Sequence, residues 1–157
     1  MERVHLVVTT VLGAEADERA AAEAAARRHG LALQVRHDRS LAVIARDTGA
    51  EAVLVLGRRR SALWLDGREH VWHAGMGELR LRRMQRGERT TRDAFLEAAA
   101  LRPGDAVLDA TLGLGMDALV AAGAVAPGGR VVAVESSPAL AALVCEGLAV
   151  LSQHVVH

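Results

Sequence analysis

The chain has 157 residues, enough for one domain or for one domain with a small partner. Its 19 basic residues balance its 19 acidic residues and 51% of the sequence is hydrophobic, which excludes a disordered chain. No apolar run reaches the ~18 residues of a membrane-spanning helix, and a single cysteine excludes a disulfide framework. We therefore expect a cytoplasmic protein with no membrane partner and no metal site.

The positive charge is concentrated in the middle of the chain. Residues 58–92 contain ten arginines against four acidic residues, whereas residues 93–157 contain two arginines against seven acidic residues. Because every basic residue is arginine, arginine richness alone reflects codon usage as readily as nucleic-acid binding. A cluster in this segment is the candidate RNA-binding surface, because arginine binds phosphate: Arg80, Arg82, Arg83, Arg86 and Arg89. The alternative is a solvated helix face.

Residues 1–74 predict a small α/β unit that ends in a hairpin. Helices are expected at Ala14–His29, before Gly30, and at Leu41–Asp47, with Ser40 as the N-cap. The expected strands are Val4–Thr10, Leu31–Val35, Ala52–Leu56, Ser61–Leu65 and Arg68–His73, the last two joined at Asp66-Gly67.

Residues 75–103 predict an arginine-rich helical connector. Its first helix begins at Gly75 and is interrupted at Gly87, with Met76, Leu79 and Arg83 on one face. A second helix is expected over Thr91–Leu101, with Phe95, Ala98 and Ala99 facing inward.

Residues 104–157 alternate strand and helix with short links, which predicts a parallel sheet with right-handed crossovers. The elements are a strand Ala106–Asp109, a helix Met116–Ala126, a strand Arg130–Glu135 and a helix that opens at Ser137-Pro138. An apolar stripe on the last helix consists of Leu140, Leu143, Val144, Leu148 and Leu151. We expect Cys145, on the same helix, to be a buried apolar residue.

The loop between the first of these strands and its helix, Thr111–Gly115, is the candidate ligand-binding segment. Gly113 and Gly115 let the backbone approach a ligand at the carboxyl end of a strand, where open α/β sheets bind ligands. Glu135 ends the next strand, and its carboxylate can accept hydrogen bonds from both hydroxyl groups of a ribose. Asp109 and Asp117 add negative charge beside the loop.

Two ligand classes fit this pattern. The spacing Gly113-x-Gly115-x-x-Ala118, followed by an acidic residue, matches a loose dinucleotide fingerprint and predicts an NAD-dependent oxidoreductase. S-adenosylmethionine carries a positive ammonium and a positive sulfonium, and carboxylates attract both but repel a diphosphate. We therefore favour S-adenosylmethionine. A strand–helix–strand unit whose glycines only pack closely is the remaining explanation.

The segments Asp109–Ala118 and Glu135–Leu148 resemble class I S-adenosylmethionine-dependent methyltransferases. They are most similar to the group that contains the small-subunit ribosomal RNA (guanine) methyltransferase J family. The resemblance implies S-adenosyl-L-methionine as cofactor, RNA as acceptor and a set of cofactor-binding residues: Asp109, Gly113, Gly115, Met116, Asp117, Glu135 and Ser136. Met116 and Ser136 depart from the arginines that the family commonly has there.

The resemblance implies an incomplete α/β, Rossmann-like parallel-sheet methyltransferase fold, preceded by the small α/β unit. The family has a seven-stranded sheet and an Asp-Pro loop after its fourth strand, and neither is matched after Asp109. We expect a chain truncated before the catalytic loop and completed by a missing C-terminal half or a second chain. The catalytic residues therefore stay unknown. The alternative is a non-catalytic remnant that binds RNA or a protein partner.

Overall fold

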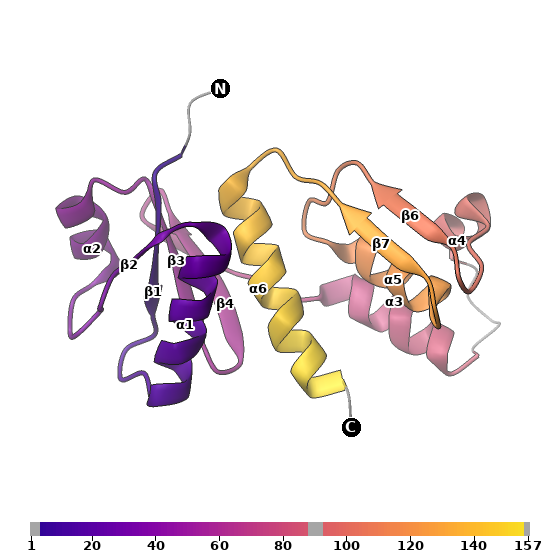
Figure 1. The fold of residues 1–157 in the computed structure, drawn as a ribbon, viewed down its shortest axis with the longest axis horizontal. Coiled ribbons are helices and arrows are strands. Elements are labelled where there is room, and N and C mark those ends of the chain that lie inside the picture. The colour runs from indigo at the N-terminus through magenta and orange to yellow at the C-terminus, as the bar shows by residue number, and fades with distance from the viewer. Residues whose placement is uncertain (1–3, 88–92, 156–157) are drawn as a thin grey trace. The chain divides into compact units, whose positions relative to one another are not determined.

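The computed structural model describes residues 4–87 and 93–155, with side chains up to Ser152. Figure 1 shows the course of the chain through two compact units. We call Met1–His73 with Ser137–His157 the five-stranded unit, and Ala74–Ser136 the glycine-loop unit. The sequence places the first boundary between Ala74 and Gly75, and in the structure the division falls one residue earlier, between His73 and Ala74. The arginine-rich connector lies within the glycine-loop unit, and the last helix belongs to the five-stranded unit, which differs from the three-part division drawn from the sequence.

The five-stranded unit has a mixed sheet in the order β2-β1-β3-β4-β5. The first three strands in this order are parallel, and β4 and β5 continue the sheet antiparallel. The β4–β5 hairpin turns at Asp66 and Gly67, both with positive φ, as the sequence predicts. The elements are β1 (Leu6–Thr10), α1 (Ala16–His29), β2 (Ala32–Leu33), α2 (Leu41–Thr48), β3 (Ala52–Gly57), β4 (Arg60–Leu65), β5 (Arg68–Val71) and α6 (Pro138–Val155).

Helices cover both faces of this sheet. Successive residues of a strand point to opposite faces, so the side chains of the buried strands contact helices on both sides. Val53 and Val55 of β3 pack with Ile44 of α2 in one hydrophobic cluster. Leu54, between them, is also fully buried and faces the other side, where α1 and α6 lie next to each other (Figure 1). The sheet of the five-stranded unit therefore lies between two layers of helices, and its core occupies both faces of the sheet.

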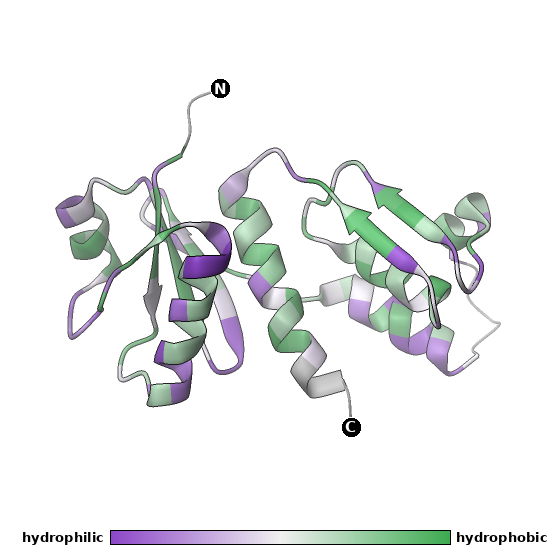
Figure 2. Ribbon diagram, viewed as in Figure 1, coloured by the Kyte–Doolittle hydropathy of each residue, from purple (hydrophilic) through white to green (hydrophobic). Residues whose placement is uncertain are grey.

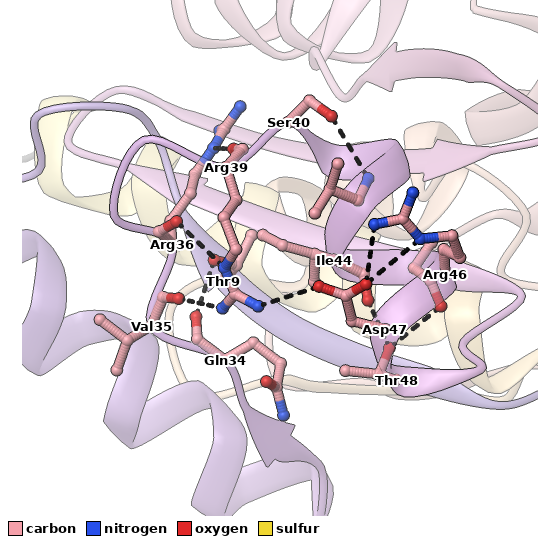
Figure 3. A network of polar contacts seen from close by, with 12 residues as sticks. Thr9, Gln34, Val35, Arg36, Arg39, Ser40, Ile44, Arg46, Asp47 and Thr48 are labelled. Atoms are coloured by element: carbon pink, nitrogen blue, oxygen red, sulfur yellow. Dashed lines mark hydrogen bonds and ion pairs between the residues drawn. The ribbon is translucent and has the colours of Figure 1, made fainter.

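The helix ends follow the signals in the sequence. Gly30 ends α1 in the left-handed conformation, and the Ser40 side chain accepts a hydrogen bond from the Val43 amide at 3.2 Å at the start of α2 (Figure 3). The same figure shows the buried Thr9 hydroxyl donating to the Gln34 carbonyl at 2.8 Å, which holds the exit of β2 against β1.

Helix α6 packs on β3 and β4 of the five-stranded unit. The Ser61 hydroxyl donates to the Leu143 carbonyl at 3.0 Å, and a Cβ on Gly147 would lie 2.2 Å from the Trp72 ring. Leu143 and Val144 are buried as expected, but Cys145 is exposed, so the prediction of a buried cysteine is wrong. The reason is rotational: the face that meets the sheet includes Glu146 and Gly147, and Cys145 lies beside it.

The glycine-loop unit has a two-stranded parallel sheet, with Ala106 opposite Arg130 and Asp109 opposite Ala133. The sequence predicted both strands, the second two residues longer than it is. Its elements are α3 (Gly75–Gln85), α4 (Ala94–Ala99), β6 (Ala106–Asp109), α5 (Met116–Val125) and β7 (Arg130–Ala133).

Helix α3 packs on α5 through small residues. A Cβ on Gly77 would lie 3.0 Å from the Met116 backbone, and one on Gly123 would lie 2.3 Å from the Leu81 side chain. The buried face of α3 therefore carries Gly77 and Leu81. The face that carries Met76 and Leu79 is turned to solvent, because Met76 is 60% exposed and Leu79 is 40% exposed.

In helix α4 only part of the predicted inward face is found. Phe95 is half-buried, whereas Ala98 and Ala99 are exposed. The helix is short and ends at Ala99, so it buries little beyond its first turn. The first two residues of the predicted helix, Thr91 and Arg92, lie outside the described residues.

One face of the two-stranded sheet is uncovered among the described residues. Figure 2 shows β6 and β7 as largely hydrophobic. Leu108 of β6 is 69% exposed, and Val132, its partner on β7, is 46% exposed. Val107 and Val131 point to the opposite side and are half-buried, because α5 packs there.

Within the described part of the chain, no helix combines the length and the hydropathy needed to cross a membrane.

Candidate functional site

The loop between β6 and α5 is built around two glycines in the left-handed conformation. Gly113 has φ 52° and Gly115 has φ 77°, values that most residues with a side chain adopt only at a cost in strain. A Cβ on Gly113 would meet only the Thr111 carbonyl oxygen, at 3.9 Å. Backbone conformation rather than crowding therefore accounts for glycine at position 113, and the space above it is open.

Glu135 lies against this loop, as the sequence predicts. The Gly113 amide donates a hydrogen bond to Glu135 Oε2 at 3.1 Å, and the Ser136 hydroxyl donates to Glu135 Oε1 at 3.3 Å. The Leu112 amide also donates to the Val134 carbonyl at 2.9 Å. The turn after the first strand is thus tied to the segment after the second, at the shared carboxyl end of the parallel pair.

A pocket of about 350 Å³ lies beside the loop. Asp109 and Asp117 are the two charged residues that line it, and Phe95 of α4 is the aromatic one. The Asp109 carboxylate accepts a hydrogen bond from the Thr111 amide at 2.9 Å, which fixes the start of the loop. The pocket is lined by Phe95, Val107, Leu108, Asp109, Ala110, Thr111, Leu112, Leu114, Met116, Asp117, Ala118 and Ala121.

The structure divides the predicted cofactor-binding residues into two groups. Asp109, Met116 and Asp117 line the pocket. Gly113, Glu135 and Ser136 form the hydrogen-bonded group on the loop. Gly115 stands between the groups as the N-cap of α5, where its carbonyl accepts the Leu119 amide.

Arg80 of α3 joins α4 to α5 through two carboxylates. Its Nε and Nη2 donate to the two oxygens of Asp93 at 2.7 and 3.0 Å, and its Nη1 donates to Asp117 at 2.6 Å. The guanidinium also lies over the Phe95 ring, 5.7 Å from its centre. These hydrogen bonds raise the pKa of Arg80, and the bonds from Arg80 hold the pKa of Asp93 below its usual value despite partial burial.

Sequence reasoning missed Asp93 and misjudged Arg80. Asp93 also caps α4, because its Oδ1 accepts the Phe95 and Leu96 amides at 3.1 and 3.2 Å. The available signal was an aspartate immediately before a short apolar helix. Arg80 was predicted to contact RNA, but its side chain is only 22% exposed and is held by two carboxylates.

The other predicted RNA-binding arginines differ in their surroundings. Arg82 forms an ion pair with Glu78, one turn earlier on α3, and stays 56% exposed. Arg83 is half-buried and Arg86 is exposed. Arg89 lies outside the described residues.

A second polar cluster lies in the five-stranded unit. Glu146 is 7% exposed. Its Oε1 accepts a hydrogen bond from Nη1 of Arg28 at 2.5 Å and lies 2.7 Å from Nε2 of His29. The sulfur of Cys145 lies within 4.8 Å of a ring nitrogen of His29 and a carboxylate oxygen of Glu146. Although the residue as a whole is exposed, partial desolvation raises the pKa of its thiol. Because Arg28 already supplies a cation to the buried carboxylate, we assign the cluster to the docking of α6 on α1.

The comparisons with known proteins give one sequence relative and one structural neighbour of note. No protein-family model matches the chain. The uncharacterized protein YpiP of Bacillus subtilis (strain 168) is 38% identical over 97 residues, which cover 61% of this chain and 37% of that protein. The crystal structure of the SAM-dependent methyltransferase NGO1261 from Neisseria gonorrhoeae matches with a TM-score of 0.53 and 23% identity.

The structural match covers 90% of this chain but 51% of the methyltransferase, so the chain spans about half of that neighbour. At this identity the match establishes the fold. The chain has a mixed α/β fold with parallel strands, like the corresponding part of the methyltransferase, and the predicted fold class is confirmed at that level.

Proposed function

We propose that this chain is part of an S-adenosylmethionine-dependent methyltransferase and that its glycine-loop unit holds the cofactor. The observation that carries the proposal is the 3.1 Å hydrogen bond from the Gly113 amide to Glu135. It brings a carboxylate at the end of one strand against a glycine turn at the end of its parallel neighbour. A ribose whose two hydroxyls donate to Glu135 would lie directly over that turn.

The residues fit this cofactor better than a dinucleotide. Both charged residues of the pocket, Asp109 and Asp117, are acidic, which favours a ligand with an ammonium and a sulfonium over one with a diphosphate. The pocket volume of about 350 Å³ is at the lower end of the range for small-molecule sites, about 300–1,000 Å³. The pocket would take the methionine part of the cofactor, and Glu135 the ribose.

When bound, the cofactor supplies an electrophilic methyl group. The residues of this chain would orient it: Glu135 through the ribose, and Asp109 through the positive charge of the methionine part. Positioning of two reactants is the main source of rate in such transfers. We propose that the residues that hold the methyl acceptor lie in further sequence, from the same polypeptide or a second chain, that extends the two-stranded sheet. In support, the methyltransferase neighbour is about twice as long as the matched region.

We further propose RNA as the acceptor. The support is the excess of arginine in residues 58–92 and the exposure of Arg82 and Arg86 on or next to α3. We leave Arg80 out of the proposed RNA-binding surface, because its guanidinium donates to Asp93 and Asp117 within the unit. Binding of RNA should weaken with salt, and replacing Arg82 and Arg86 by glutamine should reduce both the affinity and its salt dependence.

Isothermal titration calorimetry with S-adenosylhomocysteine tests the cofactor assignment. We expect binding by the full chain, and a loss of about tenfold to hundredfold in affinity for Glu135→Ala, because charge-assisted hydrogen bonds to the ribose are removed. Asp38→Asn, an exposed carboxylate in the five-stranded unit, is the matched control and should bind like the wild type.

Other results of the same titration separate the alternatives. Binding of NAD with no response to S-adenosylhomocysteine would support an oxidoreductase and contradict the proposal. Salt-dependent RNA binding with neither nucleotide bound would support a non-catalytic remnant. Equal affinity of wild type and Glu135→Ala would remove Glu135 from the site.

A further inference from the structure

The two carboxylates of the pocket have different electrostatic partners. Asp117 forms an ion pair with Arg80 at 2.6 Å. Asp109 forms no ion pair among the described residues, and its carboxylate accepts a hydrogen bond from the Thr111 amide. Two acidic side chains therefore line the pocket, and the charge of one is matched in part by a guanidinium that also pairs with Asp93.

Arg80 is well placed to keep that match. Its side chain is only 22% exposed, and the bidentate contact with Asp93 fixes the guanidinium plane. Asp93 is held in turn as the N-cap of α4. The guanidinium can therefore not swing away from Asp117 without breaking three charge-assisted hydrogen bonds.

We propose that Arg80 sets the charge selectivity of the pocket: its single positive charge, shared between Asp93 and Asp117, offsets part of the negative charge of Asp117 and so limits the attraction of the pocket for a positive ligand. The proposal rests on the proposed function, since it concerns how this site distinguishes S-adenosylmethionine from S-adenosylhomocysteine. These two ligands differ by a methyl group and by the sulfonium charge. The ratio of their affinities therefore reports the electrostatic potential at the sulfur.

The same contacts give Arg80 a second effect on the site. Its guanidinium lies over Phe95, and Asp93 binds the Phe95 amide, so the aromatic wall of the pocket depends on the same residue. Removing Arg80 should weaken both ligands through this wall. Only the exposed charge of Asp117 should change the ratio between them.

The test is calorimetry with both ligands on five proteins: wild type, Asp109→Asn, Asp117→Asn, Arg80→Gln and Arg80→Gln with Asp117→Asn. We expect Asp109→Asn and Asp117→Asn each to lower the preference for S-adenosylmethionine, because each removes a negative charge from the lining of the pocket. Arg80→Gln should raise the preference by about threefold to tenfold, because it uncovers the Asp117 charge. The double variant should return the preference to that of the wild type. High salt should reduce the change.

Two results would overturn the proposal. One is an unchanged preference in Asp117→Asn, which would remove this carboxylate from the charge balance of the site. The other is an unchanged preference in a folded Arg80→Gln protein. If Arg80→Gln fails to fold, Asp117→Asn decides, because it does not remove the Arg80–Asp93 contact.

Failure of the proposed function has a different signature. Wild-type protein that binds neither ligand contradicts the methyltransferase assignment itself and the selectivity proposal with it. The Arg80–Asp117 pair can then still be measured without ligand. Thermal unfolding of the two single variants and the double variant should give non-additive losses if the pair exists, and additive losses if it does not.

Discussion

The five-stranded unit and the glycine-loop unit differ in how many faces of their sheets are covered by helices. In the first, helices cover both faces, and Val8, Ile44 and Val55 are completely buried. In the second, α5 covers one face of two strands, and Leu108 on the other face is 69% exposed. Parallel sheets are normally covered on both faces. The comparison teaches that the unit with the recognisable chemistry is also the unit whose sheet is covered on one face only, among the described residues.

The difference between the two units would be contradicted if a residue on the exposed sheet face contributed as much to the free energy of unfolding as a residue of the buried core. We expect Ile44→Ala to lower the free energy of unfolding by about 2–5 kcal/mol, because it leaves a cavity beneath α2. Leu108→Ala should change it by less than about 0.5 kcal/mol. Urea unfolding of both variants, followed by circular dichroism, measures the difference. Equal losses would mean that Leu108 is covered in the protein in solution.

The place of α6 in the five-stranded unit can be tested at Gly147. A Cβ there would meet the Trp72 ring at 2.2 Å, so Gly147→Ala should cost about 1–3 kcal/mol, although alanine favours a helix. Fluorescence-detected unfolding reports on Trp72 together with Trp64, the second tryptophan of the chain, which lies on β4 of the same unit. Ser152→Ala, on the exposed side of the same helix, is the control and should have little effect. A stabilised Gly147→Ala protein would show that α6 does not dock on this sheet.

The stability of the glycine-loop unit should depend in part on the contact between Arg80 and Asp93. Asp93→Ala removes a helix cap and the partner of Arg80, and we expect a loss of about 1–2 kcal/mol. The pKa of Asp93 is lowered in the folded protein, so its contribution is complete above the pKa of the unfolded chain, about 4.

This contribution should disappear as the pH falls below about 4 and through the lower pKa of the folded state. Urea midpoints of wild type and Asp93→Ala across this acidic range should therefore converge as the pH falls. A constant difference between the two proteins at every pH would contradict the ion pair with Arg80.

The smallest expected effect is at the glycine turn. Gly113 has φ 52° with open space around the position of a Cβ, so Gly113→Ala should cost only about 1 kcal/mol of conformational strain. Gly113→Asn should cost less, because asparagine tolerates this conformation. Thermal unfolding of the two variants checks the order. A much larger loss in both would mean that the turn is crowded by structure that the described residues do not include.

The contact between Gly113 and Glu135 could be predicted because the carboxyl ends of neighbouring parallel strands meet at one edge of a sheet. The helix ends at Gly30 and Ser40 and the turn at Asp66-Gly67 could also be predicted, since each depends on local sequence. The packing partners of other residues could not be predicted from the sequence. An apolar stripe predicts that a helix is buried but not against what, which is why the docking of α6 on β4 and the exposure of Cys145 were missed.

The Arg80–Asp93–Asp117 contacts have the same explanation. They join three successive helices through side chains 13 and 37 residues apart, and their geometry depends on how closely Gly77 and Gly123 let α3 approach α5. Sequence reasoning saw a row of arginines and predicted a surface for RNA. Packing turned one of them inward.

Nuclear magnetic resonance mapping of the ligand site tests the central claim most directly. Titration of the labelled chain with S-adenosylhomocysteine should shift the amide signals of Gly113, Gly115 and Ser136 first, with NAD producing no comparable change. Shifts confined to the five-stranded unit, or the same loop signals responding to NAD alone, would contradict the account.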